Sequence, residues 1–175
     1  MNKTAKELYL SDIKRHGNNC KFDIKQFYKF FRLAQVEKNK ILSKYYRVRL
    51  RLIKDKYGLE IPYNLQCGKG LYLGHAYNIT INGNAILGDN INIHKGVTIG
   101  RENRGKRKGS PKIGNCVWIG INAVIVGNIT IGDDVMIAPN AYVNCDVPSH
   151  SIVLGNPCTI HHRDNATEGY INNTV

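Results

Sequence analysis

The chain has 175 residues, a formal net charge of +12 and an ordinary apolar content of 42%. No apolar run approaches the roughly 20 residues that span a bilayer, and no apolar stretch follows the charged first residues, so we expect neither a membrane helix nor a secretory signal. The five cysteines are scattered and form no Cys-x-x-Cys pair, which argues against a zinc site and a disulfide framework. We therefore expect reduced thiols in a cytoplasmic protein that holds no metal.

The positive charge is concentrated in two places. Residues 1–60 carry sixteen Lys and Arg against six Asp and Glu, whereas residues 61–175 carry nine against seven. Six of those nine basic residues lie between Arg101 and Lys112. Such patches attract nucleic acid, acidic lipid or a phosphate-bearing small molecule. The second patch has no aromatic residue for base stacking, so we expect no nucleic-acid partner.

Residues 1–60 predict a basic module of three helical segments. The segments are Lys6–His16, a stretch that Asp23 caps and that continues to Phe31, and Glu37–Tyr57. Gly58 is placed to end the third segment.

Aromatic and aliphatic side chains recur along the second and third segments at helical spacing. They are Phe22, Phe27, Phe30 and Phe31, then Ile41, Tyr45, Val48, Leu52 and Ile53. The first interpretation is that both stripes pack on the next domain or on a neighbouring subunit. The alternative is a basic amphipathic surface that rests on an acidic membrane leaflet, which would place the protein peripherally at the inner face of the membrane.

From Ile81 onward an aliphatic residue recurs every six positions. The hexads begin at Leu87, Ile93, Ile99, Ile113, Ile119, Ile125, Ile131, Ile137 and Val143, and Ile61, Cys67 and Leu73 continue the series backwards. A period of six fits neither an amphipathic helix nor an alternating strand, and it is typical of a parallel β-helix. We therefore predict an all-β solenoid over residues 61–160, with a tail at 161–175.

The hexads also predict which residues face inward. The aliphatic residue at position one and the small residue at position five, such as Val97 or Ala123, should both point into the solenoid. The Gly, Asn and Asp residues between them tolerate positive φ and should turn the corners.

Two departures interrupt the repeat. The segment Gly70-Leu-Tyr-Leu-Gly-His-Ala-Tyr-Asn78 carries two extra residues, and the interval from Ile99 to Ile113 carries eight. A solenoid expels extra residues as loops at its edge, where they commonly build the binding face. We expect the loop at 101–111 to flank a cleft.

The run from Gly70 to Ile160 resembles the hexapeptide-repeat acyltransferases, and within them the serine acetyltransferase-like branch. The resemblance rests on Gly-Leu-Tyr-Leu-Gly-His75, Val97-Thr-Ile-Gly100, Pro111-Lys-Ile-Gly114, Val117-Trp-Ile-Gly-Ile-Asn-Ala123 and Val153-Leu-Gly-Asn-Pro-Cys-Thr-Ile160. It implies a left-handed β-helix, homotrimers with active sites at subunit interfaces, and acetyl-CoA as cosubstrate.

The resemblance also implies the catalytic residues. His75 matches the family's general base, and Glu60 falls where the carboxylate that orients the imidazole sits. A histidine with a pKa near 6.5 can take the proton of an acceptor hydroxyl as that hydroxyl attacks the thioester. No acyl-enzyme is required, so no cysteine is needed as a nucleophile.

Further residues are carried over as ligand contacts. Gly100, Gly120 and Ala138 lie near the family's path for the pantetheine chain of CoA, and Lys112 and Arg163 are candidate phosphate contacts. His94, Arg107 and Ser110 are the candidate acceptor-side residues.

Two positions depart from the enzymes that use serine. They carry Asp directly before the catalytic histidine, where this chain has Gly74, and Arg-His before the Pro-Lys-Ile, where it has Gly109-Ser110. The resemblance with these changes favours a sugar hydroxyl as acceptor, as in capsule and exopolysaccharide acetyltransferases.

Three alternatives stay open. A serine O-acetyltransferase of cysteine biosynthesis would need neighbouring residues to compensate for the two changes. A γ-class carbonic anhydrase needs three zinc-binding histidines, and the six histidines here include no His-x4-His pair. A non-catalytic polyanion-binding scaffold would explain the charge but not the His75 segment.

Overall fold

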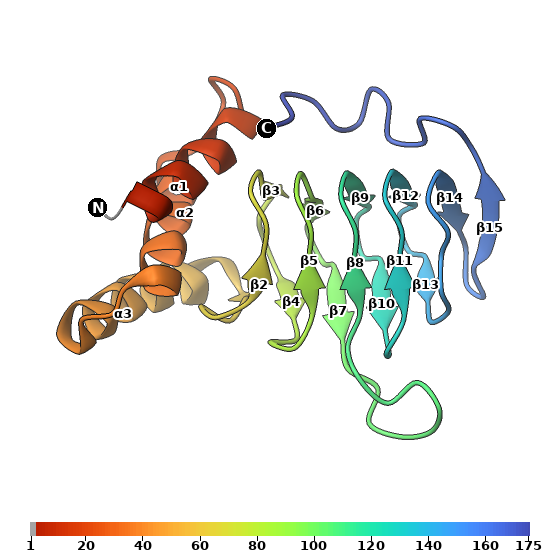
Figure 1. The fold of residues 1–175 in the computed structure, drawn as a ribbon, viewed down its shortest axis with the longest axis horizontal. Helices are drawn as coiled ribbons and strands as arrows, with labels where there is room; N and C mark the ends of the chain where they lie inside the picture. Colours follow the sequence, from red (N-terminus) through yellow and green to blue (C-terminus); the bar gives the residue numbers. More distant parts are fainter. Residues whose placement is uncertain (1–2) are drawn as a thin grey trace.

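The computed structural model describes residues 3–175 as a helical cap on one end of a three-sided β-solenoid (Figure 1). The helices are α1 (Lys3–Arg15), α2 (Phe22–Val36) and α3 (Lys40–Tyr57). The solenoid strands are β1 (Leu59–Glu60), β2 (Gln66–Cys67), β3 (Tyr72–Gly74), β4 (Ile79–Ile81), β5 (Ile86–Leu87), β6 (Asn92–His94), β7 (Thr98–Gly100), β8 (Lys112–Ile113), β9 (Val117–Ile119), β10 (Val124–Val126), β11 (Thr130–Ile131), β12 (Val135–Ile137), β13 (Tyr142–Val143), β14 (Ser151–Leu154) and β15 (Thr159–His162).

Successive strands pass from one parallel sheet to the next. The first sheet, A, has the order β1-β4-β7-β10-β13, the second, B, β11-β8-β5-β2, and the third, C, β15-β14-β12-β9-β6-β3. Ile81 pairs with Ile99, eighteen residues later, so one coil consists of three hexads. The predicted solenoid is confirmed. Its strands extend slightly past the expected bounds, from Leu59 to His162, and β15 closes the last coil by pairing antiparallel to β14.

The interior of the solenoid follows the hexad pattern. Position-one residues such as Ile99 and Ile119, and position-five residues such as Val97 and Ala123, are all completely buried. Asn and Asp residues with φ between 52° and 61° turn several corners, namely Asn78, Asn90, Asn122, Asp134 and Asn140. The predictions of the inward positions and of the corner residues are confirmed.

The helical module differs from the prediction in its caps. Asp23 does not cap α2: Lys21 is the N-cap and makes no side-chain cap hydrogen bond. The Asp23 carboxylate instead accepts hydrogen bonds from Lys56 Nζ (2.5 Å) and Tyr57 Oη (2.9 Å), which ties α2 to the end of α3. Asn39 caps α3 at its start, and Gly58 ends it in the left-handed conformation, as expected.

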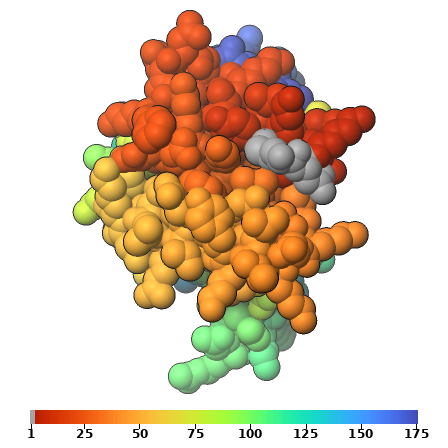
Figure 2. Space-filling model, turned by 90° about the vertical axis from the view of Figure 1, so that its left-hand side faces the viewer, coloured from red at the N-terminus to blue at the C-terminus, as the bar shows by residue number. Residues whose placement is uncertain are grey.

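Phe27, Phe30 and Phe31 of α2 are buried, as the first interpretation expected, whereas the apolar stripe of α3 is not covered within one chain. Packing of the α3 stripe on a neighbouring subunit stays a prediction. Ile41 is 81% exposed, and Val48 and Leu52 are also exposed. The helix packs through the neighbouring face, where Leu50 is buried and Ile53 is partly buried. Figure 2 views this end of the molecule, where α3 contributes much of the visible surface. No helix within residues 3–175 is both long and apolar enough to cross a membrane, and peripheral membrane binding stays a prediction.

A fully buried ion pair joins the helices to the first coil. Arg32 donates from Nε and Nη2 to the two Asp12 carboxylate oxygens, at 2.7 and 2.9 Å. The same guanidinium reaches the carbonyl oxygens of Cys67 and Gly68, and Asp12 accepts the backbone N–H of Leu71. The ion pair links α1 to α2, and the contacts with Cys67, Gly68 and Leu71 link both helices to the chain from β2 to β3. This pair therefore fixes the position of the cap on the solenoid.

Replacing Arg32 by methionine should lower the free energy of unfolding by about 3–5 kcal/mol, because Asp12 would keep a buried carboxylate without its partner. Urea unfolding followed by circular dichroism measures the change. The control is Arg51→Met, which removes an exposed pair with Asp55 and should cost less than about 1 kcal/mol. Equal effects of the two substitutions would contradict the anchoring role of Arg32.

Candidate active site

The site residues gather in a row at the edge between the third sheet and the first. Gly74, the last residue of β3, pairs with His94, the last residue of β6. The register Ile93–Ile119–Ile137 of the neighbouring strands continues this row through Gly120 and Ala138. His75 follows Gly74 directly, at a φ of 51°. Coil stacking therefore places His75 at the start of a row that consists of Gly74, His94, Gly120 and Ala138.

The imidazole of His94 occupies the space that a side chain at Gly74 would need. A Cβ atom built on Gly74 would lie 2.5 Å from His94 Cε1 and 2.6 Å from Nδ1, which is closer than such contacts allow. The glycine before His75 is thus matched to the histidine stacked on it from the next coil. The predicted acceptor-side residue His94 does lie next to His75.

His94 lies within an aromatic cluster on the outer face of the third sheet. Its ring centroid is 4.8 Å from that of Trp118 and 6.4 Å from those of Tyr72 and His75. Burial lowers the pKa of His94, and the charge of His75 lowers it further. The buried Nε2 atom of His94 has no hydrogen-bond partner among the described residues.

His75 and Glu60 are not in contact within one chain. The His75 side chain is exposed and makes a ring contact with His94. Glu60 projects from β1 on another sheet, where its strand neighbour is Thr80. The predicted orienting carboxylate is therefore not delivered by the fold of a single chain.

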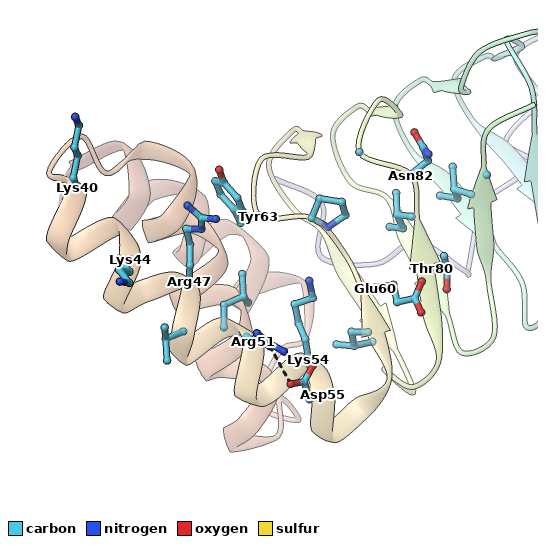
Figure 3. A pocket seen from close by; sticks show the side chains of 18 residues that line it. Lys40, Lys44, Arg47, Arg51, Lys54, Asp55, Glu60, Tyr63, Thr80 and Asn82 are labelled. Atoms are coloured by element: carbon cyan, nitrogen blue, oxygen red, sulfur yellow. Dashed lines mark ion pairs between the residues drawn. The ribbon is translucent and has the colours of Figure 1, made fainter. Parts of the chain in front are cut away.

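Glu60 instead lines a large groove between α3 and the first sheet, with a cavity of about 1080 Å³ (Figure 3). Gly100 lies in the same groove, as does Asn82, which accepts a hydrogen bond from Ser110 Oγ at 3.0 Å. The opposite wall, on α3, is mainly basic. It carries Lys40, Lys44, Arg47, Arg51 and Lys54, with Asp55 paired to Arg51. Burial lowers the pKa of Lys54, while the charges of Asp55 and Glu60 oppose that shift.

The remaining predicted contacts are scattered. The loop protrudes between β7 and β8 as expected (Figure 1), and Arg107 in it donates to Glu102 at 3.1 Å. Lys112 is exposed on β8 in the second sheet, and Arg163 follows β15 at the end of the solenoid. One chain therefore places His75 next to His94, with Gly120 and Ala138 further along the same row. It places Glu60 and Gly100 in the groove, with Ser110 bonded to Asn82 of that groove. Arg107, Lys112 and Arg163 lie outside both groups.

Sequence reasoning missed two residues beside the His94 cluster, Arg15 and His16 at the end of α1. The His16 ring stacks on Tyr72, with centroids 4.3 Å apart, and its Nε2 atom lies 2.8 Å from Tyr28 Oη. Burial, reinforced by the Arg15 charge, lowers the pKa of His16 to about 4. No motif marks either residue, because only the docking of α1 on the third sheet brings them there.

His16 should make the protein less stable as the pH falls from about 6.5 to about 4. The folded-state pKa is depressed, so in this window the unfolded chain binds a proton that the folded chain does not. The loss should stay below about 1.4 kcal/mol per pH unit, because the ring is partly exposed and screened. Urea unfolding at several pH values measures it. His16→Asn should flatten the dependence relative to an exposed control, His161→Asn, and equal slopes would contradict this assignment.

The family model "Bacterial transferase hexapeptide (six repeats)" matches residues 110–145. A serine acetyltransferase of Helicobacter pylori is 38% identical over 98 residues, which cover 56% of this chain and 57% of that protein. The first curated relatives are matched over 30% to 57% of their lengths, so the chain corresponds to about half or less of each.

Solved structures extend the match. Neisseria gonorrhoeae serine acetyltransferase, solved in complex with serine, is 30% identical with a TM-score of 0.71, covering 91% of this chain and 70% of that one. Serine acetyltransferase from Brucella abortus, solved with coenzyme A, shares the fold with a TM-score of 0.76 at 24% identity, over 93% of this chain and 69% of that one.

These matches correct the prediction of a polysaccharide acceptor. The relatives and structural neighbours named above are serine acetyltransferases, and a similarity to capsule or exopolysaccharide enzymes is not shown. The predicted acceptor rested on two positions, Gly74 and Gly109-Ser110, at which this chain differs from the enzymes that use serine. The prediction gave less weight to the rest of the matched segment. His94 fills the space beside Gly74, so the small size of the glycine has a packing reason in this chain.

Proposed function

We infer that this chain, which belongs to the hexapeptide-repeat transferase family, is an acetyl-CoA-dependent O-acetyltransferase with L-serine as its acceptor. The observation that carries the proposal is the match over 91% of the chain to a serine acetyltransferase solved with serine. The exposed imidazole of His75 at the end of the row of small residues supplies the chemistry.

In the proposed reaction His75 is the general base. It accepts the proton of the serine hydroxyl while that oxygen attacks the carbonyl carbon of acetyl-CoA. The tetrahedral intermediate then collapses, the C–S bond breaks, and CoA leaves as the thiol after taking up the proton from His75. Backbone N–H groups at the coil edge would stabilise the oxyanion. The two small residues Gly120 and Ala138 follow in register along the row, and they stay predictions as contacts of the pantetheine chain. Lys112 and Arg163 stay predictions as phosphate contacts.

We propose further that the catalytic pair is completed in a homotrimer. Within one chain His75 lies at an edge of the solenoid, whereas Glu60 and Gly100 line the groove on the first sheet. A neighbouring copy that presents this groove to His75 would bring the carboxylate to the imidazole. Glu60 would then hold the His75 ring in one tautomer, as the carboxylate does in hydrolase triads.

Release of CoA from acetyl-CoA, followed with a thiol reagent, tests the activity. We expect turnover with L-serine, and a reduction of kcat by about 10²- to 10⁴-fold in His75→Ala, because the general base is lost. The matched control is His161→Ala, an exposed histidine on β15, which should retain full activity. Turnover with sugars but not with serine would contradict the proposed acceptor. Full activity of His75→Ala would contradict the proposed base.

Mixing two inactive variants tests the assembly. His75→Ala and Glu60→Ala, unfolded together and refolded as mixed trimers, should regain activity, because some interfaces then pair an intact His75 with an intact Glu60. Light scattering checks that each variant is trimeric. Refolded mixtures that stay as inactive as either variant alone would show that the two residues do not meet across an interface.

A further inference from the structure

Two cysteines meet in the last coil of the solenoid. Cys145 follows β13, on the turn that leaves the first sheet, and Cys158 lies in the turn between β14 and β15. These strands form the end of the solenoid opposite the helices (Figure 1). The two Sγ atoms are 3.8 Å apart and share a hydrogen bond. The residues are thirteen positions apart, so no Cys-x-x-Cys motif marks them, and only the closing hairpin brings them together.

Hydrogen bonds of the backbone hold both thiols in place. On one side of Cys145, the Tyr142 N–H donates to the Gly155 carbonyl oxygen at 3.0 Å, which ties β13 to the hairpin that carries the second cysteine. On the other side, the Asp146 carboxylate accepts the Thr130 N–H at 2.7 Å. The approach of the two sulfurs is therefore a property of the last coil, and neither cysteine lies on a free segment.

Joining the sulfurs requires a small movement. A disulfide has a sulfur–sulfur distance of about 2.05 Å, so Cys145 Sγ and Cys158 Sγ would approach each other by about 1.8 Å. Within one chain the Cys145 side chain is exposed and that of Cys158 is half-buried. Rotation of the two side chains can therefore close the gap without moving the strands.

The other three cysteines are placed differently. Cys20 is buried, and its Sγ atom contacts a backbone carbonyl oxygen. Burial raises the pKa of Cys67 to about 11 and also raises the pKa of Cys116. All five cysteines lie within the described residues, and among them Cys145 and Cys158 form the one thiol–thiol contact. An oxidant that makes a disulfide within one chain should therefore select this pair.

We propose that Cys145 and Cys158 are a reversible dithiol site, which a low-molecular-weight disulfide oxidises to a disulfide within the chain. The Cys145 thiolate attacks one sulfur of the oxidant, whose S–S bond breaks, and a first small thiol leaves. The Cys158 thiolate then attacks Cys145 Sγ in the mixed disulfide and displaces the second small thiol. The two cysteines lose two electrons and two protons, which the two released thiols carry away. The new bond fastens the closing hairpin to the last coil, and the proposal does not depend on the acetyl-transfer reaction.

The pH at which the exchange runs follows from the surroundings of Cys145. Burial raises its pKa most, the hydrogen bond and charge of Cys158 and the charge of Asp146 raise it further, and the Arg107 charge opposes the shift. Because the thiolate is the attacking species, we expect slow exchange at about pH 7 and faster exchange at about pH 9.

Treatment of the full chain with oxidised glutathione at about pH 9 tests the proposal. The reaction is stopped with acid, and the remaining thiols of the unfolded protein are alkylated. Cleavage before Asp134, Asp146 and Asp164 leaves Cys145 and Cys158 on different fragments. We expect mass spectrometry to find these two fragments joined, and dithiothreitol to separate them. A non-reducing gel should show that the chain stays monomeric in denaturant. Fragments that remain separate, or a disulfide between two chains, would overturn the proposal.

Two variants identify the partners. Cys158→Ser should stop at a glutathione adduct on Cys145, because the second attacking thiol is missing. The matched control is Cys116→Ser, which removes a thiol outside the pair and should still give the joined fragments. Loss of the joined fragments in Cys116→Ser, or a lasting glutathione adduct on Cys145 in the unsubstituted protein, would overturn the assignment.

Thermal unfolding provides a second measurement on the same samples. The oxidised protein should melt several degrees above the reduced protein, because the cross-link restricts the unfolded chain. The same treatment should leave the melting temperature of Cys145→Ser unchanged within about one degree, since it cannot form the bond. An oxidised protein that melts at the same temperature as the reduced one, or lower, would contradict a disulfide that fits the native last coil.

Discussion

Coil stacking is the constraint on which the rest of this structure depends. Each strand takes its backbone hydrogen bonds from the coils before and after it, so residues at equivalent positions of successive coils lie in rows. One such row holds Gly74, His94, Gly120 and Ala138, and it ends beside His75. The same constraint forces the extra residues after Ile99 out of the body as a loop, because no coil has room for them.

Stacking also explains why single positions are poor guides to the acceptor. Gly74 is small because the ring of His94 lies against it, and a side chain at one position excludes a side chain at the other. The two residues are twenty positions apart in the sequence. An interpretation of either residue alone therefore misses the fact that the two positions are packed against each other. The comparison with serine acetyltransferases covers the whole segment and is less sensitive to it.

The buried pair between Asp12 and Arg32 decides what the end of α1 can do. Because it locks α1 and α2 onto the first coil, Arg15 and His16 are held against the outer face of the third sheet. Both Asp12 oxygens are bonded within this anchor, and the neighbouring Arg15 bonds Asn92 of the third sheet instead. One ion pair thus stabilises the junction and sets where the end of α1 lies on the third sheet.

The sequence by itself determined the solenoid, its inward residues and its extruded loop. A hexad repeat is a local pattern, and parallel stacking of the coils places equivalent residues of each hexad on the same side of the chain. It also singled out His75 through a motif of adjacent residues, and it placed Gly58 at the end of α3. It did not predict that Asp23 binds Lys56 and Tyr57, or that Arg107 pairs with Glu102. Nor did it predict that the apolar stripe of α3 is exposed within one chain. These features depend on which face of each element is covered. Only the tertiary structure separated His75 from Glu60 and brought Arg15 to His94, because contacts between a helix and a sheet distant in the sequence follow from docking geometry that no local pattern encodes.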